Sequence, residues 1–406
     1  MPSAYIYMEH PGTAEVLTLG KLTLHHNKPG EFVYSPSAID ARVWVPDPIR
    51  YPLSDQVFTI TRNQGVPGFI DDAMPDGWGE RLLQRMQRDP VSRFDLLVGS
   101  PNSDRVGNLM TGRDKAPPVG VGQKPLSRLT GLDRFIDICD VVYDNDIGDE
   151  DVKALGVRDQ RSSVGGARPK RTFSGDRKLI LAKPHDRYDP YELAPVEHAC
   201  MTFAAKKGMR VAKTSLYHDK KGTTLLVERF DRRYVDGVFR RVPFLSGLTL
   251  LDTEWTVADL TARSYARLAD EMYRRKVPDA DRRELYLRMA YNVLTGNTDD
   301  HPRNHAIIFI DGGWRLSPMY DVLPILDEGR ARYMSMSVGI DGVKVTRSNL
   351  LSQHLHFALT KDEAEGILDQ VAGWADELRE YYGCFFKGKA LEAAREAVSA
   401  EGLLSG

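Results

Sequence analysis

One polar run in the C-terminal half constrains the fold and chemistry of this chain more than any other segment. Residues 297–304 have the sequence NTDDHPRN, and a further acid, Asp321, follows. Enzymes that transfer phosphoryl groups in the manner of protein kinases place an Asp, an Asn five positions later and a second Asp in this order. By that pattern, Asp299 orients the attacking hydroxyl and accepts its proton. Asn304 and Asp321 supply oxygen ligands for Mg²⁺.

The residues on either side of this run fit the same interpretation. Upstream, apolar residues recur with helical spacing at Tyr286, Met289, Ala290, Val293 and Leu294. Gly296 stands where a helix C-terminus favours a residue with positive φ. Downstream, residues 306–310 and 314–316 are typical of two strands joined by a turn at 311–313. The pattern predicts a helix, a polar loop, a hairpin and then Asp321.

Two other interpretations of the run remain open. The polar residues could simply cap and solvate a loop. Asp299, His301 and His305 could also bind Zn²⁺ or Mn²⁺ in a metal hydrolase. No HExxH helix or CxxC pair supports the second alternative.

A glycine-containing loop with flanking cations lies upstream, at residues 162–170, with the sequence SSVGGARPK. Its glycines could let backbone N–H groups approach phosphate oxygens. It matches neither the Walker A motif nor the standard kinase GxGxxG pattern, and taken alone it could be a surface turn. The residues of this loop that could contact ATP are Val164, Gly165, Gly166, Ala167, Arg168 and Lys170.

A predicted hairpin and helix follow the loop. Residues 171–173 and 178–183 are expected to form strands around a turn at 174–176, so that Lys183 closes an apolar strand and could reach the α- and β-phosphates. Glu197, on a predicted helix, is the candidate partner of Lys183. Each could equally be solvated, Lys183 at a strand end and Glu197 on an exposed helix face.

Residues 223–231 have the sequence TTLLVERFD, which predicts a buried strand that runs into a polar linker. In a two-lobed kinase the adenine ring binds the backbone at this position. Glu228, Arg229 and Phe230 are therefore candidates for the adenine contact, although their side chains could serve only packing and solvation.

Several motifs, in this order, resemble the HipA-like serine/threonine kinases, the toxin halves of bacterial toxin–antitoxin pairs. They are Ser163-x-x-Gly166-x-x-Pro169-Lys170, LAKP at 181–184, VERFDRR at 227–233, GNTDDHPRN at 296–304 and Tyr320-Asp321. The sequence MPDGWG at 74–79 resembles the N-terminal subdomain of that family, so the resemblance covers most of the chain.

The resemblance implies an α+β, two-lobed protein-kinase-like fold with an additional β-rich N-terminal subdomain and a mainly helical C-terminal lobe. It implies use of ATP and Mg²⁺, with Asp299 as catalytic base, Asn304 and Asp321 as metal ligands, Lys183 as phosphate clamp and His301 near ATP. Glu228, Arg229 and Phe230 would lie at the adenine hinge. Ser163 would be autophosphorylated, with Ser162 as the adjacent alternative.

The same resemblance implies two partners. One is a small helix-turn-helix antitoxin that binds operator DNA. The other is a protein substrate with a serine or threonine acceptor, for which an aminoacyl-tRNA synthetase is one candidate. Two rival functions are an aminoglycoside-type small-molecule kinase and a catalytically silent co-repressor that acts with the antitoxin.

Composition supports an ordinary globular protein in the cytoplasm. The 406 residues are 42% hydrophobic and 28% charged, and the three cysteines have no disulfide or metal spacing. The first residues lack the features of a signal peptide, and no apolar run approaches the length of a spanning helix, so no membrane contact is expected. The net charge of −2 gives no sign of direct DNA binding, so DNA contact is expected only through the antitoxin.

The sequence also predicts where segments begin and end. Residues 1–112 are expected to form the N-terminal subdomain and residues 113–125 a linker rich in Pro and Gly. Residues 126–230 are expected to form the small-lobe-like region with the glycine-rich loop and Lys183. Residues 231–406 are expected to form the helical catalytic lobe.

Overall fold

The computed structural model describes residues 2–26, 28–86, 90–143, 166–186, 188–254, 260–326, 329 and 331–404. The chain divides into two compact units. Unit 1 comprises residues 1–187 and 226–245, and unit 2 comprises residues 188–225 and 246–406. The chain thus passes between units at 187/188, 225/226 and 245/246. The segment boundaries expected from sequence, at 112, 125 and 230, stay predictions.

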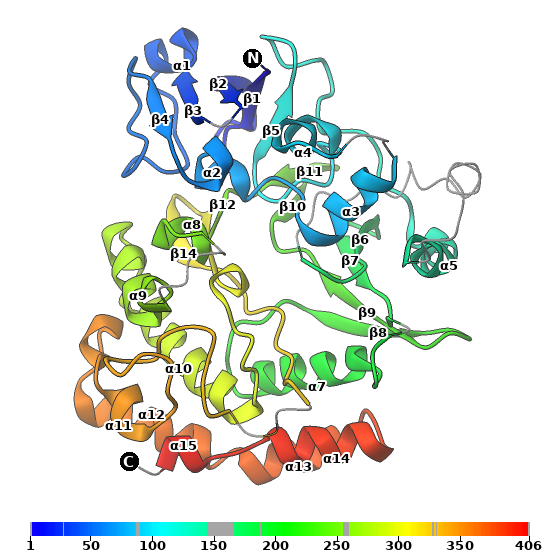
Figure 1. Cartoon of the computed structure of the whole chain (residues 1–406), viewed down its shortest axis with the longest axis vertical. Helices are drawn as coiled ribbons and strands as arrows, with labels where there is room; N and C mark the ends of the chain where they lie inside the picture. Colours follow the sequence, from blue (N-terminus) through cyan, green and yellow to red (C-terminus); the bar gives the residue numbers. More distant parts are fainter. Residues whose placement is uncertain are drawn as a thin grey trace. The chain divides into compact units, whose positions relative to one another are not determined.

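Unit 1 begins with a five-stranded antiparallel sheet in the order β4-β3-β2-β1-β5 (Figure 1). The strands are β1 (Ser3–Glu9), β2 (Val16–His25), β3 (Lys28–Tyr34), β4 (Phe58–Ile60) and β5 (Leu109–Gly112). Alternate residues of the sheet, among them Ile6, Leu22 and Phe32, are buried, as period-2 alternation requires.

Short helices follow the strands of this sheet. They are α1 (Pro36–Asp40), α2 (Gly68–Asp71), α3 (Gly77–Met86) and α4 (Arg93–Gly99), with the 3₁₀ turn η1 (Asn63–Gly65). Helix α4 begins with a capping box in which Ser92 and Asp95 satisfy each other's backbone N–H groups.

The remainder of unit 1 contains two hairpins. In the first, β6 (Arg171–Ser174) pairs with β7 (Leu179–Lys183), and Gly175 N–H closes the turn on the carbonyl of Lys178 at 2.9 Å. In the second, β10 (Arg232–Val235) pairs with β11 (Val238–Arg241). The other elements of this part are the 3₁₀ turn η2 (Leu129–Gly131), α5 (Leu132–Tyr143), the end of β9 (Thr223–Glu228) and the start of β12 (Phe244–Ser246). The predicted hairpin before Lys183 and the predicted strand at 223–228 are confirmed.

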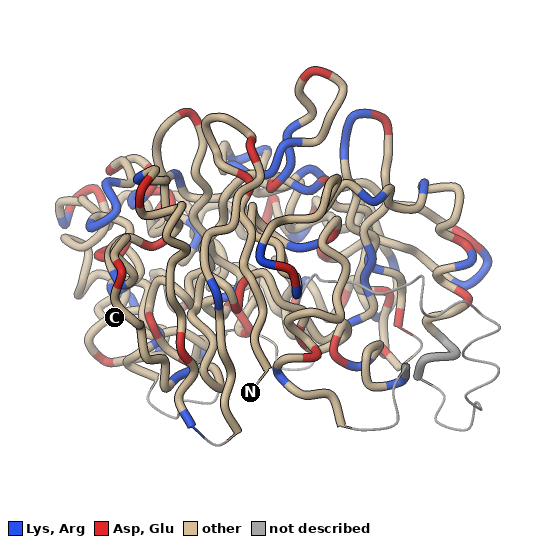
Figure 2. The backbone as a smooth tube through the Cα atoms, turned by 90° about the horizontal axis from the view of Figure 1, so that it is seen from above, with Lys and Arg blue, Asp and Glu red and all other residues tan. Residues whose placement is uncertain are grey.

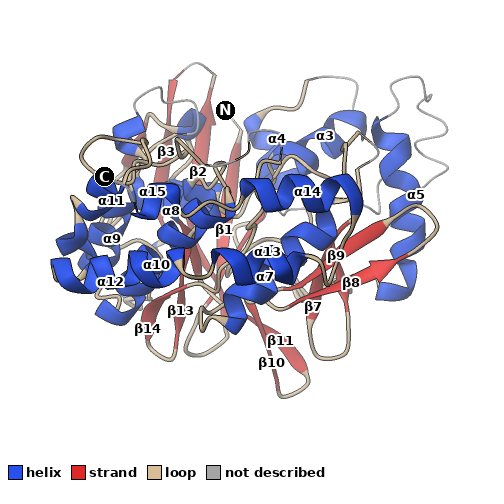
Figure 3. Ribbon diagram, turned by 90° about the horizontal axis from the view of Figure 1, so that it is seen from below, coloured by secondary structure: helices blue, strands red, loops and turns tan. Residues whose placement is uncertain are grey.

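Unit 2 is mainly helical, with the helices drawn in blue in Figure 3. Its helices are α7 (Leu193–Lys206), α8 (Gly247–Leu251), α9 (Tyr265–Arg274), α10 (Asp279–Thr295), α11 (Arg347–Leu351), α12 (Lys361–Ala372), α13 (Ala375–Tyr382), α14 (Gly388–Ala397) and α15 (Glu401–Leu404), with 3₁₀ turns η4 (Leu260–Ala262), η5 (Pro302–Asn304) and η6 (His354–Phe357). Its strands are β8 (Thr214–His218), β13 (Ala306–Ile310) and β14 (Gly313–Leu316).

Helix α10 is central to unit 2 because it is buried on more than one side. Leu285, Met289 and Leu294 are fully buried on it, and so are the polar residues Arg288 and Asn292. The helix packs against α9 and α12. Among the described residues, no helix has the length and apolar character needed to cross a membrane.

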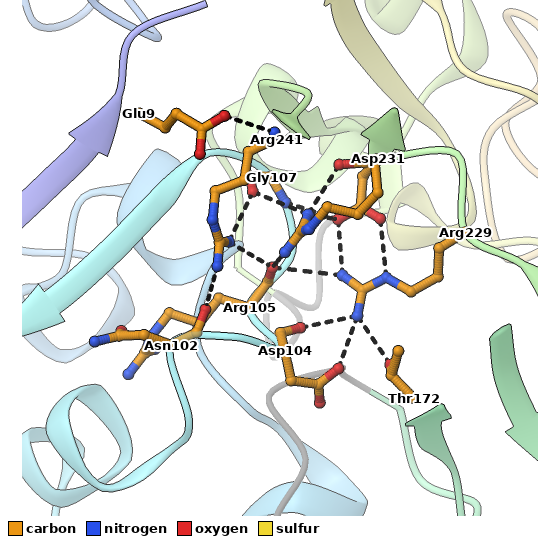
Figure 4. A network of polar contacts seen from close by, with 10 residues as sticks. Glu9, Asn102, Asp104, Arg105, Gly107, Thr172, Arg229, Asp231 and Arg241 are labelled. Atoms are coloured by element: carbon orange, nitrogen blue, oxygen red, sulfur yellow. Dashed lines mark hydrogen bonds and ion pairs between the residues drawn. The ribbon is translucent and has the colours of Figure 1, made fainter. Parts of the chain in front are cut away.

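A buried charge network joins distant segments of unit 1 (Figure 4). The Arg229 guanidinium donates to both carboxylate oxygens of Asp231, at 2.9 and 2.8 Å, and to Oδ1 of Asp104 at 2.7 Å. Its Nη1 also donates to Thr172 Oγ1, at 2.9 Å. Arg232 Nη1 donates to Asp231 Oδ2 at 2.7 Å, and the N–H of Gly107 donates to the same oxygen at 3.0 Å.

The same network fixes the backbone at residues 102–107. Arg232 and Arg241 donate to the carbonyl of Arg105, and Arg241 Nη2 donates to the carbonyl of Asn102. Burial alone would raise the pKa of the Asp231 carboxyl, but Arg229, Arg232 and the N–H of Gly107 hold it well below its ordinary value. Asp231 is therefore a carboxylate on which two buried guanidinium groups depend.

Replacing Asp231 with Ala should strongly destabilise the protein, because Arg229 and Arg232 would keep buried charges without their main partner. The expected loss is about 3–5 kcal/mol in the free energy of unfolding, measured by urea denaturation. Glu31→Ala is a control in the same unit, since Glu31 is half exposed and lies 3.7 Å from His25 Nε2. That control should cost less than about 1 kcal/mol. Equal losses of unfolding free energy in Asp231→Ala and Glu31→Ala would show that the network stabilises the protein no more than the exposed Glu31 does.

Candidate functional site

The polar loop at 297–305 is held between α10 and β13, as the sequence predicts. Helix α10 ends at Thr295, and Gly296 follows with φ 75°. A Cβ at Gly296 would lie 3.0 Å from both Cβ and the carbonyl oxygen of Ala397, so both backbone conformation and packing favour glycine. After the loop, β13 and β14 form the expected antiparallel hairpin. Its turn uses Asp311 and Gly312, both with positive φ.

The two adjacent acids of this loop have opposite environments. Asp299 is exposed, whereas Asp300 is only 2% exposed. Oδ2 of Asp300 accepts hydrogen bonds from the hydroxyl of Tyr265 and from Nδ2 of Asn292, the latter at 2.7 Å. It also lies 2.8 Å from Nε2 of His305. Asp300 thus connects the loop to α9, α10 and the residue before β13.

The electrostatics of this cluster favour an ionised Asp300. Burial alone would raise the pKa of the Asp300 carboxyl, but His305 and the hydrogen bond from Tyr265 outweigh it, and the pKa is lowered. Burial, and next the Asp300 charge, raise the pKa of Tyr265 well above its ordinary value, so Tyr265 stays a donor. Asp300 therefore holds the loop through its hydrogen bonds, and Asp299 is the acid of the pair that faces solvent.

The two predicted metal ligands lie on segments that are linked by a hydrogen bond. The hydroxyl of Tyr320 donates to the carbonyl of Arg303 at 2.7 Å, which connects the residue before Asp321 to the residue before Asn304. Asn304 is 8% exposed, at the end of η5. Asp321 has φ 61°, an uncommon conformation for a residue other than glycine. One carboxylate and one amide oxygen suit Mg²⁺, which keeps phosphate and water as its other ligands.

The alternative hydrolase site gains no support from this geometry. His305 is 3% exposed and its Nε2 is engaged by Asp300. Among the residues that the structure describes, no three His, Cys, Asp or Glu side chains form a group that could hold a metal ion. His301 is partly exposed, and its carbonyl accepts the N–H of Asn304 at 2.8 Å.

In unit 1, two of the predicted phosphate contacts lie at the same end of one hairpin. The β6–β7 register pairs Arg171 with Ala182, and Lys170 and Lys183 are the residues next to this pair in sequence, at the same end of the hairpin. Arg168 is exposed and Lys170 is 8% exposed. Lys170 and Lys183 are two cations at one hairpin end, an arrangement suited to an anion such as a phosphate chain.

The predicted adenine contacts lie near the other end of β7. The N–H of Arg229 donates to the carbonyl of Leu179 at 2.8 Å, and Lys178 Nζ lies 3.9 Å from Glu228 Oε2. Leu179 and Lys183 are four residues apart, about 13 Å along a strand. The ring of Phe230 stacks on Phe244, with centroids 6.5 Å apart. Because the side chain and N–H of Arg229 are already engaged, a contact of this residue with adenine would use its carbonyl oxygen.

Four of the predicted residues lie outside the part of the chain that the structure describes. Three residues that hold Asp300 were not predicted in that role. Ser162, Ser163, Val164 and Gly165 lie outside the described residues. Glu197 is 6% exposed on α7 in unit 2 and Lys183 belongs to unit 1, so their pairing stays a prediction. Local patterns did not identify Tyr265, Asn292 and His305 as the residues that hold Asp300. Asn292 lies outside the apolar face that the spacing from Tyr286 to Leu294 predicts, so periodicity gave no signal for it.

Acid should weaken unit 2 in part through Asp300. Because its folded-state pKa is below the ordinary value of about 4, the ionised carboxylate contributes stability above that value, and the contribution is lost as pH falls through the folded pKa. We expect the free energy of unfolding to fall more steeply below about pH 5, and on toward about pH 2, in wild type than in Asp300→Asn. Asp376→Asn, at a 93% exposed side chain, should keep the wild-type slope. Parallel curves for wild type and Asp300→Asn would contradict the assignment.

Comparisons with known proteins match both halves of the chain. The model of the HipA-like C-terminal domain matches residues 162–378, and that of the HipA N-terminal domain matches residues 14–110. The serine/threonine-protein kinase toxin HipA of Shewanella oneidensis is 28% identical over 188 residues, which are 41% of this chain and 43% of that protein. The protein Y4mE of Sinorhizobium fredii is 25% identical over 329 residues, 75% of this chain and 74% of that protein.

A solved structure extends the comparison to the whole fold. It is a chain of the complex of HipA, HipB and operator DNA from Shewanella oneidensis MR-1, with a TM-score of 0.72 and 19% identity. The match covers 99% of this chain and 96% of that one. The expected α+β, kinase-like fold is thereby confirmed. The two domain matches show that the chain belongs to the HipA-like family.

Proposed function

We propose that this protein is an ATP- and Mg²⁺-dependent serine/threonine-protein kinase that acts as the toxin of a bacterial toxin–antitoxin pair. The observation that carries the proposal is the division between the two acids of the loop. Asp300 is buried and bound by Tyr265, Asn292 and His305, while Asp299 faces solvent five residues before Asn304. A general base must be accessible to the hydroxyl that it deprotonates.

Each candidate residue has a role in this proposal. Asp299 orients the substrate hydroxyl and accepts its proton. Lys183, Lys170 and Arg168 offer positive charge to the ATP phosphates, and the backbone at 228–230 offers polar groups to adenine. Asn304 and Asp321 hold Mg²⁺, with His301 beside the nucleotide. When bound, the Mg²⁺ neutralises charge that develops on the phosphates.

The comparisons support the proposed substrate class and partner. The Shewanella relative is named a serine/threonine-protein kinase toxin, and the solved complex contains HipB and operator DNA. By analogy, the substrate is a protein serine or threonine in the cytoplasm, and an antitoxin mediates contact with DNA. Basic and acidic residues are interspersed along the backbone in Figure 2, and the net charge is −2, which agrees with indirect rather than direct DNA binding.

The protein is also proposed to phosphorylate itself on Ser163. A phosphate there would add a charge of about −1.5 to −2 next to the proposed ATP-binding loop. It would compete with the ATP phosphates for Arg168 and Lys170, so that the modification would switch the kinase off. Mass spectrometry of the purified protein after incubation with Mg-ATP distinguishes Ser163 from Ser162. An unmodified Ser163 would remove this part of the proposal.

Asp299→Asn should lower the rate of phosphoryl transfer by at least about 10²-fold, because Asn cannot accept the proton. The fold and the affinity for ATP should stay close to those of wild type, since Asp299 is exposed. Turnover of ATP and binding by calorimetry test both expectations. Asp300→Asn is the matched neighbour, for which we expect the main effect in stability. A fully active Asp299→Asn variant would remove the base from this position.

Asp321→Ala should abolish the dependence of nucleotide affinity on Mg²⁺, because one of the two proposed ligands is a carboxylate and the other a neutral amide. Calorimetric titrations of ATP with and without Mg²⁺ measure this dependence in wild type and variant. Asp311→Asn, in the turn of the neighbouring hairpin, serves as the control and should behave as wild type. A variant that binds Mg-ATP as tightly as wild type would place the metal site elsewhere.

A further inference from the structure

The described end of the glycine-rich loop is bound by a segment about ninety residues earlier in the chain. The N–H of Trp78 donates to the carbonyl of Gly166 at 2.9 Å, and the N–H of Gly166 donates to Oδ1 of Asp76. Arg81 Nη2 contacts the carbonyl of Ala167 at 3.4 Å. Both segments belong to unit 1. The N–H and the C=O of Gly166 are therefore both engaged by the sequence MPDGWG at 74–79.

Glycine is favoured at the two closest positions. Gly77 has φ 43°, and a Cβ there would lie 2.6 Å from the carbonyl oxygen of Gly166. Gly166 has φ 111°, and a Cβ there would lie 2.1 Å from Nζ of Lys170. A Cβ on Gly77 would meet backbone atoms, so the two backbones approach this closely only because Gly77 has no side chain. At Gly166 the flexible Lys170 side chain could move aside, and it is the positive φ that favours glycine. The ammonium of Lys170 lies directly beside the backbone that Asp76 holds.

The segment that holds Gly166 is itself anchored in the core of unit 1. Trp78 and Leu82 are completely buried, and Met74 is 4% exposed. Just before it, the carbonyl of Ala73 accepts a hydrogen bond from Nη1 of Arg105 at 2.8 Å. Arg105 is fully buried, and its own carbonyl accepts hydrogen bonds from the guanidinium groups of the charge network. The support of Gly166 is therefore rigid.

We propose that Asp76 is a positioning residue for nucleotide binding, and that Gly77 and Trp78 complete its contact with Gly166. By fixing both polar groups of Gly166, the segment sets the conformation from which the described end of the loop, residues 166–170, meets the ATP phosphates. The N-terminal subdomain thereby contributes to phosphate binding without touching the nucleotide. This inference rests on the proposed function, because it assigns ATP to the glycine-rich loop.

The test compares nucleotides that differ in their phosphates. Asp76→Ala should weaken binding of Mg-ATP by at least about 5-fold, the effect of losing a charge-assisted hydrogen bond. Binding of adenosine, which has no phosphate, should not change. Asp76→Asn keeps an acceptor oxygen and should restore most of the ATP affinity. Gly77→Ala should resemble Asp76→Ala, because its methyl group displaces Gly166.

A matched control separates this contact from the general strain of a positive φ. Gly237 has φ 83° in the turn between β10 and β11, and a Cβ there would meet nothing within 4 Å. Gly237→Ala should bind ATP as wild type does. Hydrogen exchange of the Gly166 amide, measured without nucleotide, should be faster in Asp76→Ala than in wild type and Asp76→Asn.

The possible results distinguish a failure of the proposed kinase function from a failure of the role proposed for Asp76. If wild type binds adenosine and Mg-ATP equally or not at all, the proposed function fails. If wild type favours Mg-ATP and both Asp76→Ala and Gly77→Ala keep that preference, the positioning role of Asp76 is wrong. Unchanged exchange of the Gly166 amide in Asp76→Ala would also overturn it, whatever the nucleotide data show.

Discussion

The charge network around Arg229 and Asp231 is the interaction on which most of unit 1 depends. Burying several guanidinium groups is costly unless every charge and donor finds a partner. Here Asp104 and Asp231 supply the charges, while backbone carbonyls at residues 102–107 supply the remaining acceptors. The network joins the end of β9 and the β10–β11 hairpin to the segment before β5. Through Arg105 it also supports Ala73 and, next to it, the segment that holds Gly166.

In unit 2 as well, a buried charged residue with several hydrogen-bond partners fixes a short segment of backbone, here the polar loop at 297–305. Asp300 is buried with donors from three separate segments, so the loop has one preferred path between α10 and β13. A buried acid with three partners on one carboxylate oxygen holds the backbone, and the adjacent acid, Asp299, is exposed. In both units, therefore, buried polar residues position short segments that carry the candidate functional groups. The proposed catalysis depends on residues that never contact the substrate.

Local sequence patterns predicted the elements that carry the site but not the contacts that hold them. The apolar spacing from Tyr286 to Leu294, Gly296 and the turn at 311–313 identified the helix, its end and the hairpin, because these depend on neighbouring residues. Arg229 was expected near adenine from its position after a strand; its side chain belongs to the buried network, which local sequence did not indicate, and the contact of its backbone with adenine stays a prediction. The bonds of Asp300 to Tyr265, and of Gly166 to Asp76, join residues 35 and 90 positions apart. No local periodicity reports such pairs.

We propose that this protein transfers the γ-phosphate of ATP to protein serine or threonine. Phosphopeptide mass spectrometry after brief induction of the protein in cells, compared with an uninduced culture, tests it most directly. We expect new serine or threonine phosphorylation on a small number of proteins within the induction period. A purified reaction with Mg-ATP and the leading candidate should reproduce the same site. Absence of any protein phosphorylation, with ATP consumed only in the presence of a small-molecule acceptor, would show that the protein is a small-molecule kinase and not a protein kinase.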